Sequence, residues 1–86
     1  MKADSKIMFY TYILQSITSP EHFYVGYTND LKKRIQTHNA GGSVHTSKFK
    51  PWKLYGYIAF DTKEKAKRFE KFLKSGNGRT FQKKFF

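Results

Sequence analysis

Two runs of β-branched and aromatic residues, joined by a short polar stretch, constrain the fold of this chain more than any other feature. Residues 7–15 and 23–28 have the composition of strands, and residues 16–22 hold the Ser, Thr and Pro that are typical of turns. This order predicts an antiparallel hairpin whose loop is longer than the tightest turns. Residues 52–60 form a similar run and predict a third strand.

A first helix is expected directly after the hairpin. Asn29 is a good N-cap, and Leu31 and Ile35 give the segment that ends near His38 an apolar stripe. Residues 39–51 begin with helix-breaking residues and show no clear period, so we interpret them as a loop.

A second helix is expected after the third strand. Asp61 followed by Glu64 has the form of a capping box, and Gly76 is suitably placed to end the helix through a left-handed cap. The apolar positions of this helix fall on one face at helical spacing: Ala66, Phe69, Phe72 and Leu73. Residues 79–86 predict a short third helix that packs its phenylalanines against the core.

The size of the chain limits it to one core. A chain of 86 residues buries only about 60–65% of its unfolded surface and cannot divide that surface into two cores. The sequence has no cysteine, so disulfides and thiolate metal sites are excluded and the cytoplasm is the expected compartment. We therefore expect a single α+β domain over residues 1–86, with a three-stranded antiparallel sheet flanked by helices. It should be ordered from about residue 7, with Asp4 in a frayed terminus.

Positive charge is concentrated in the later part of the chain. The net charge is +11, and residues 1–31 carry two basic against three acidic side chains, whereas residues 32–86 carry fifteen against three. A polyanion is the expected partner, DNA first and RNA second, because neutralising phosphates releases counterions and drives sequence-independent binding. A membrane is not expected as a partner, because the apolar run 7–14 is too short to span a bilayer.

The chain has only six acidic residues, so the search for a metal-binding carboxylate is short. Glu70 has no evident role in a turn, a cap or a terminus, and helical spacing places it at the border of the buried stripe. A carboxylate there can be held rigidly and still reach a hard divalent cation such as Mg²⁺, which commonly takes only one or two protein carboxylates. The alternative is an ordinary i, i+4 ion pair with Lys74, which geometry alone slightly favours.

Two functional side chains share one ridge of the first helix. Arg34 and His38 are one turn apart and lie beside the apolar stripe. An arginine there can bridge phosphate oxygens and offset the charge that develops in phosphoryl transfer. A histidine can hydrogen-bond or transfer a proton near neutral pH. Alternatively, both side chains merely border the core, which is the commoner situation for a histidine alone.

The hairpin strands contain a candidate pair of tyrosines. Side-chain alternation would set Tyr12 and Tyr24 on the same side of the sheet if the register is suitable. A phenol can orient or deprotonate a water when a cation lowers its pKa, although most tyrosines in an aromatic-rich chain serve packing. Gly26 lies inside the second strand, where a glycine often marks the close approach of a ligand, a bulge or another backbone.

Two polar segments are candidate phosphate contacts. His45 and Lys48 lie in the expected loop, and Asn77 and Arg79 follow the second helix. Imidazole, ammonium and guanidinium groups and backbone amides all bind phosphate oxygens. A solvated loop and a helix stop would explain the same residues without a ligand.

In this order, the residues resemble the GIY-YIG nuclease superfamily. The run from Tyr24 to Arg34 resembles the second motif of the family and the arginine that follows it. Tyr12 stands where the first motif has its tyrosine, although Tyr10 and Thr11 replace the usual Gly and Ile. The resemblance covers nearly the whole chain and is closest to short, single-domain bacterial members.

The resemblance implies the GIY-YIG endonuclease fold and a metal-dependent DNA endonuclease that acts in DNA repair or processing. Catalytic roles are implied for Tyr12, Tyr24, Arg34, His38 and Glu70. Glu70 is then the single protein ligand of one Mg²⁺ or Mn²⁺ ion, and either tyrosine could activate the water. With the polar segments included, the expected substrate-binding residues are Gly26, His45, Lys48, Asn77 and Arg79.

Two other functions fit the same sequence. A module that retains the nuclease fold without cleaving would bind DNA or RNA through the same charge. A ribosome-associated or structural basic protein would show no clustering of Tyr12, Tyr24, Arg34 and Glu70 in space. No separate DNA-reading module is evident, so sequence preference would require a homodimer, a partner protein or recognition of DNA shape.

Overall fold

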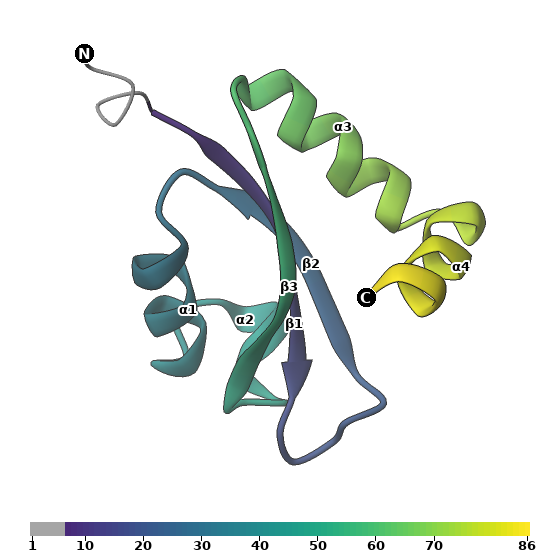
Figure 1. The fold of residues 1–86 in the computed structure, drawn as a ribbon. Helices are drawn as coiled ribbons and strands as arrows, with labels where there is room; N and C mark the ends of the chain where they lie inside the picture. The colour runs from purple at the N-terminus through teal and green to yellow at the C-terminus, as the bar shows by residue number, and fades with distance from the viewer. Residues whose placement is uncertain (1–6) are drawn as a thin grey trace.

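A three-stranded antiparallel sheet forms the centre of the protein, as the sequence predicts (Figure 1). The computed structural model describes residues 7–86, and Asp4 lies outside the described residues. The strands are β1 (Phe9–Ser16), β2 (Phe23–Thr28) and β3 (Trp52–Phe60), in the order β2-β1-β3. The helices of the described part are α1 (Leu31–Asn39), α2 (Val44–Ser47), α3 (Lys63–Leu73) and α4 (Gly76–Phe85). None of these helices is long and apolar enough to cross a membrane.

Side-chain alternation along β1 divides the core between the two faces of the sheet. Tyr12 and Leu14 are buried on the face that α1 and α2 cover, where they pack with Trp52. Ile13 is buried on the opposite face, where it packs with Leu73 of α3 beneath the α3 and α4 layer. Figure 1 shows the two helix layers on either side of the sheet. Both faces of the central strand are therefore covered.

The strand register sets the two candidate tyrosines on one face. Tyr12 pairs with Gly26, and Leu14 pairs with Tyr24, so Tyr24 lies diagonal to Tyr12 across the β1–β2 ladder. The pairing of β1 with β3 shifts register between Ile13 and Leu14. The sequence left open whether the register would place Tyr12 and Tyr24 on the same side of the sheet, and the structure shows that it does.

The caps of α1 and α3 each lie one residue later than predicted. Asp30, not Asn29, caps α1, and its carboxylate accepts from the Lys33 amide at 3.1 Å. The Thr28 hydroxyl accepts from the Asp30 amide at 3.1 Å, and this turn delays the helix start. Thr62, not Asp61, caps α3. At both positions the adjacent residue is an equally good cap by type, so only the path of the backbone decides between them.

The loop predicted for residues 39–51 contains a short helix, and Gly76 does not end α3. Residues Val44–Ser47 form α2, which is too short to show a period in sequence. Gly76 is the first residue of α4, which therefore begins three residues before the predicted start. Ser75 caps α4, because its hydroxyl accepts from the Gly78 amide at 3.2 Å. The glycines at this point serve a tight helix-to-helix turn.

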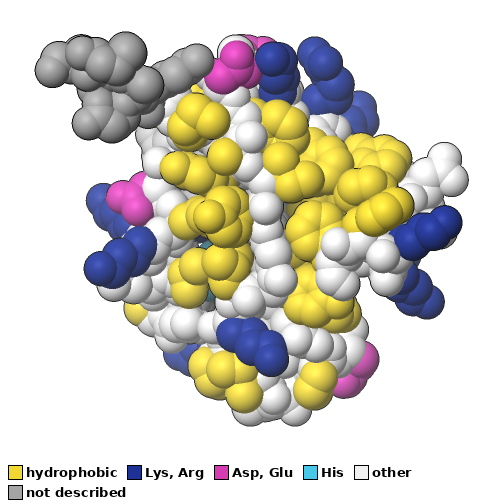
Figure 2. Space-filling model, viewed as in Figure 1, with side chains coloured by type: hydrophobic (Ala, Val, Ile, Leu, Met, Phe, Trp, Pro, Cys, Tyr) yellow, Lys and Arg dark blue, Asp and Glu magenta, His cyan; other side chains and the backbone are white. Residues whose placement is uncertain are grey.

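The aromatic layer under α3 and α4 reaches the surface. Phe69 and Phe81 lie with ring centroids 5.8 Å apart and perpendicular planes. Phe72 and Phe85 extend this cluster outward and are 38% and 67% exposed. Figure 2 shows apolar side chains gathered over this side of the molecule, with Lys and Arg side chains at its rim.

Candidate active site

A pocket of about 450 Å³ collects the candidate catalytic residues. Strands β1 and β2 and helices α1 and α3 supply its walls, so it lies where the two helix layers meet along β2. Four of the five expected catalytic residues line it: Tyr12, Tyr24, Arg34 and Glu70. This clustering argues against a structural basic protein, for which no such grouping is expected.

The Tyr12 hydroxyl is the most connected atom of the site. It lies 2.9 Å from His38 Nε2 and accepts from Arg34 Nε at 3.3 Å. The Tyr12 side chain is fully buried. Gly26 lies directly against it, because a Cβ at that position would stand 2.6 Å from the Tyr12 oxygen. Gly26 is therefore a glycine because the Tyr12 side chain packs against its backbone. The close approach that the sequence predicted at this position is made by a residue of the protein itself.

His38 connects Tyr12 to helix α2. It is 0% exposed, and its Nδ1 lies 2.8 Å from the hydroxyl of Thr46, which is also 0% exposed. The Thr46 hydroxyl can donate to the Ser43 carbonyl at 3.5 Å, which leaves its oxygen free to accept from His38 Nδ1–H. We therefore assign the Nδ1–H tautomer, in which Nε2 accepts the proton of the Tyr12 hydroxyl.

The charges around this chain of hydrogen bonds favour a neutral histidine. Burial, followed by the positive charge of Arg34, lowers the pKa of His38 below its ordinary value of 6.5. Burial also raises the pKa of the Tyr12 phenol, and the hydrogen bond from Arg34 opposes that rise. The bond to Tyr12 raises the pKa of Arg34, which stays charged. At neutral pH the site holds a neutral phenol, a neutral imidazole and a guanidinium cation.

Tyr24 lies next to this network and is more accessible than Tyr12. Its ring centroid is 6.3 Å from that of Tyr12 and 4.8 Å from that of His38. It is partly exposed and lines the pocket. The two phenols thus share one face, with only the Tyr12 hydroxyl bonded to the histidine.

Glu70 enters the pocket from α3 and forms the ion pair that the sequence offered as an alternative, while its role as a metal ligand stays a prediction. Its carboxylate accepts from Lys74 Nζ at 2.8 Å, which is the expected i, i+4 pair. Its side chain is 20% exposed and lines the pocket. Lys63 lines the same pocket and lies seven residues before Glu70, two helical turns away on the same side of α3. The ion pair with Lys74 therefore does not remove Glu70 from the pocket lining.

The sequence matches the model of the GIY-YIG catalytic domain over residues 8–84. This chain belongs to the GIY-YIG nuclease family. Tyr12, which resembles the tyrosine of the first motif, is hydrogen-bonded to Arg34 and His38 of α1. The bonds of Tyr12 are made by the phenol and by residues from α1, so they do not depend on the side chains at Tyr10 and Thr11.

Similar proteins support the same assignment. A UPF0213 protein of Streptococcus pyogenes serotype M3 is 42% identical over 72 residues, which cover 83% of this chain and 76% of that protein. The solution NMR structure of the UPF0213 protein BH0048 from Bacillus halodurans matches with a TM-score of 0.52 and 33% identity, covering 90% of this chain and 81% of that one. A Giardia intestinalis homologue of the structure-specific endonuclease subunit SLX1 is 38% identical over 65 residues, or 71% of this chain. This chain spans only 18% of the length of that protein.

The donor set of this GIY-YIG domain fits an ion that takes few protein ligands. Within residues 7–86, no group of three or more His, Cys, Asp or Glu side chains could hold a metal ion. Glu70 is the one carboxylate in the pocket lining, beside phenol and amide oxygens. Mg²⁺ and Mn²⁺ suit such a site, because water and phosphate oxygens supply most of their ligands. A preformed cage for Ca²⁺ or Zn²⁺ is not built here.

The expected substrate-binding residues are spread over three places. Gly26 lines the pocket. His45 and Lys48 lie on or just after α2, outside the pocket lining. Asn77 lies in the first turn of α4, and Arg79 lines a separate groove. The roles of these residues stay predictions.

Two residues of the site were not singled out from the sequence. Thr46 lies in a segment interpreted as a loop, next to the histidine that was singled out, and no local pattern marks it. Lys63 could have been found by its i, i+7 spacing from Glu70, which places both on one side of a helix. The pocket thus contains a second cation beside Arg34.

Proposed function

We propose that this GIY-YIG domain is a metal-dependent endonuclease that hydrolyses phosphodiester bonds of DNA, with a role in DNA repair or processing. One observation carries the proposal. The Tyr12 hydroxyl is held between His38 Nε2 and Arg34 Nε, in a pocket that Glu70 also lines. This arrangement brings together a histidine that can accept a proton through Tyr12, an arginine that can bind phosphate and a single carboxylate.

Tyr12 is the residue best placed to activate the attacking water. In the assigned tautomer its proton already points to His38 Nε2, so its oxygen can take a proton from water as it gives its own to His38. Tyr12 is fully buried, and Arg34 donates to its oxygen. Water can therefore reach this oxygen only after Arg34 turns away from it toward a phosphate. Tyr24, on the same face, orients the water from the pocket side.

The two cations of the pocket bind the phosphate. The planar guanidinium of Arg34 can bridge two phosphate oxygens and stabilise the charge that grows in the transition state. Lys63 adds a second positive charge to the same pocket. Glu70 would hold the divalent ion, which when bound supplies Lewis-acid stabilisation of the scissile phosphate and the leaving oxygen.

DNA as the substrate rests on two supports. The later part of the chain, residues 32–86, carries fifteen basic against three acidic side chains. A polyanion with regularly spaced phosphates is the partner that such charge binds best. The similar protein of Giardia intestinalis is named as a structure-specific endonuclease subunit homologue, which agrees with a role in DNA repair or processing.

Nicking of supercoiled plasmid in Mg²⁺ or Mn²⁺ tests this function. Glu70→Ala and Arg34→Ala should abolish nicking while the thermal unfolding midpoint stays close to that of the parent protein. Glu64→Ala is the matched control, because it removes an exposed carboxylate from the first turn of the same helix, outside the pocket.

Two outcomes contradict the proposal. Full nicking activity in both pocket variants would exclude these residues from the mechanism. DNA binding without cleavage in every metal tested, unaffected by Glu70→Ala, would identify the non-cleaving nucleic-acid-binding module instead.

A further inference from the structure

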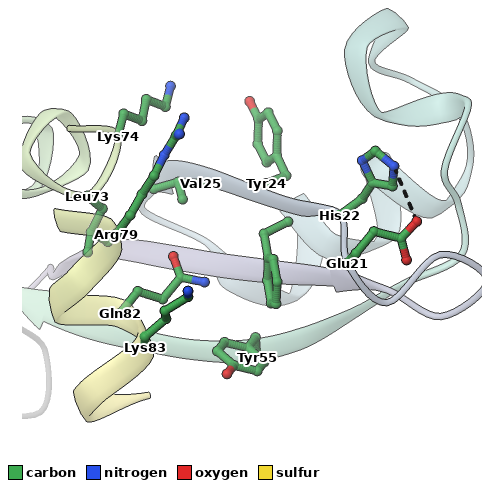
Figure 3. A pocket seen from close by; sticks show the side chains of 11 residues that line it. Glu21, His22, Tyr24, Val25, Tyr55, Leu73, Lys74, Arg79, Gln82 and Lys83 are labelled. Atoms are coloured by element: carbon green, nitrogen blue, oxygen red, sulfur yellow. Dashed lines mark ion pairs between the residues drawn. The ribbon is translucent and has the colours of Figure 1, made fainter. Parts of the chain in front are cut away.

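A second groove runs along β2 next to the active site. It encloses about 700 Å³ between the end of the sheet and helix α4 (Figure 3). Tyr24 lines both the groove and the active-site pocket. Lys74, which donates to the carboxylate of Glu70, also lines the groove. The groove therefore adjoins the active-site pocket at Tyr24 and at the Lys74–Glu70 pair.

Exposed aromatic rings form one part of the groove. Phe23 of β2 and Tyr55 of β3 line it, and they are 40% and 36% exposed. Their ring centroids are 5.0 Å apart in an edge-to-face arrangement. The Tyr55 hydroxyl donates to the Phe86 carbonyl at 3.3 Å, which fixes the ring in place. The groove thus presents flat apolar surfaces that are held before any ligand arrives.

Cations form the other part. Arg79 and Lys83 lie one turn apart on α4 and line the groove with Lys74. Figure 3 shows Lys74 and Arg79 extended on the same side of β2 as the Tyr24 hydroxyl. Within residues 7–86, no ion pair is recorded for Arg79 or Lys83.

The acidic side chain of the groove lies apart from these cations. Figure 3 shows Glu21 at the opposite end from α4. Its carboxylate is 3.6 Å from the imidazole of His22. The cationic side chains therefore gather at the α4 end of the groove, where Lys74 also contacts Glu70 of the active-site pocket.

We propose that this groove binds an unpaired strand of DNA that continues from the scissile phosphate, an inference that rests on the proposed nuclease function. An unpaired nucleotide offers a base that can stack and a phosphate that can pair with a cation, and the groove supplies both partners. Duplex DNA keeps its bases stacked inside the helix, so Phe23 and Tyr55 would have no base to contact. Their contribution is therefore specific to unpaired DNA.

Binding measured by fluorescence anisotropy in EDTA tests the groove without cleavage. The probes are a short oligothymidine and a duplex of equal length. Phe23→Leu/Tyr55→Leu removes the rings and keeps apolar side chains, and it should weaken oligothymidine binding roughly tenfold for one lost stacked base. Its duplex affinity should stay unchanged. An oligouridine that binds the protein more tightly than oligothymidine would overturn the assignment to DNA.

The cationic part is tested by a charge-matched pair of variants. Arg79→Gln/Lys83→Gln should weaken oligothymidine binding more than Arg68→Gln/Lys84→Gln, which removes two exposed positive charges outside the groove lining. All four of these side chains are exposed, so their substitution should not disturb folding. The two glutamine variants therefore test the groove even if the leucine variant fails to fold. Equal losses in both variants would overturn the proposal.

A cleavage assay distinguishes failure of the groove proposal from failure of the proposed nuclease function. The parent protein should cut a duplex with an unpaired tail faster than the same duplex without a tail, and the leucine variant should lose that preference. If the leucine variant cut both substrates at the rates of the parent protein, the groove would not bind the unpaired strand, and the proposed nuclease function would stand. No cleavage of either substrate by the parent protein would refute the nuclease function, while the binding measurements still judge the groove.

Discussion

The two faces of the sheet are packed by different kinds of contact. On the α1 and α2 face, Tyr12, His38 and Thr46 are fully buried and joined by hydrogen bonds. On the α3 and α4 face, Ile13 and Leu73 are buried under phenylalanine rings. Among the described residues, no buried side-chain nitrogen or oxygen lacks a partner. Hydrogen bonds fix direction as well as distance, whereas apolar packing constrains mainly volume.

The polar face holds the side chains proposed for the chemistry, and the apolar face positions the helix that carries Glu70. The polar face holds the Tyr12 hydroxyl in one orientation, as a proton-transferring group requires. The apolar face anchors α3, which brings Glu70 and Lys63 to the edge of β2. Changes on the apolar face should therefore act on stability, and changes on the polar face should act on activity.

The largest expected effect is on the stability of the apolar face. In Gly78→Ala, the new Cβ would clash with the Phe72 carbonyl oxygen, a backbone atom that cannot move aside by itself. The turn between α3 and α4 would have to open, and we expect a loss of about 1–3 kcal/mol in the free energy of unfolding, measured by urea denaturation. Gly76→Ala is the control: nothing lies within 4 Å of its Cβ, and alanine favours a helix by roughly 0.5–1 kcal/mol. If both glycine variants lost the same stability, close packing at Gly78 would not be the cause of its loss.

A smaller change in stability with a specific change in activity is expected on the polar face. Thr46→Val keeps the shape of the side chain and removes the hydroxyl that His38 Nδ1 contacts. The other histidine tautomer then competes, and it cannot accept the proton of Tyr12. We expect about 1 kcal/mol of lost stability and a roughly fivefold slower nicking rate with unchanged DNA affinity.

Thr46→Ser separates orientation from packing at this position. It retains the hydroxyl and should recover most of the nicking rate although it loses a methyl group. If the serine variant were as slow as the valine variant, Thr46 would act only by filling space.

The last expected effect, which appears only on acidification, is a pH dependence that His38 contributes to stability. Burial and Arg34 lower the pKa of His38 below 6.5 in the folded protein. As pH falls below 6.5, the unfolded chain binds a proton at this histidine that the folded protein does not, so the free energy of unfolding decreases. The slope is at most about 1.4 kcal/mol per pH unit for one proton.

Urea denaturation at several pH values between neutral and mildly acidic conditions checks this slope. His38→Gln should show a shallower loss of stability than the parent protein, and His45→Gln, at an exposed position, is the matched control. Parallel curves for the parent protein and His38→Gln would show that this buried histidine does not govern the acid response.

The parts of the fold that sequence alone predicted are those with strong local patterns. The strands follow runs of β-branched and aromatic residues, and α3 follows an apolar stripe that ends at Leu73. The cap positions and α2 were predicted incorrectly. Neighbouring residues such as Asn29 and Asp30 are equivalent by type, and a helix of four residues is too short to show a period.

The site divides in the same way. Residue type and spacing drew attention to Tyr12, Tyr24, Arg34, His38 and Glu70, and the resemblance to GIY-YIG nucleases selected them as catalytic candidates whose roles stay predictions. Sequence alone left open whether Glu70 binds a metal ion or only pairs with Lys74; the structure shows the pair and a side chain that also lines the pocket, and the metal role stays a prediction. That question depends on how α3 crosses the sheet.

The sequence by itself determined that this chain forms an α+β sheet with a small set of candidate catalytic residues in the order of a GIY-YIG domain. Only the tertiary structure decided that Tyr12 is buried between His38 and Arg34, and that the groove beside Tyr24 combines rings with cations. The physical reason is distance along the chain. Tyr12 and Arg34 lie far apart in sequence, as do Phe23 and Tyr55, and these pairs meet only through the packing of strands and helices, which no local pattern encodes.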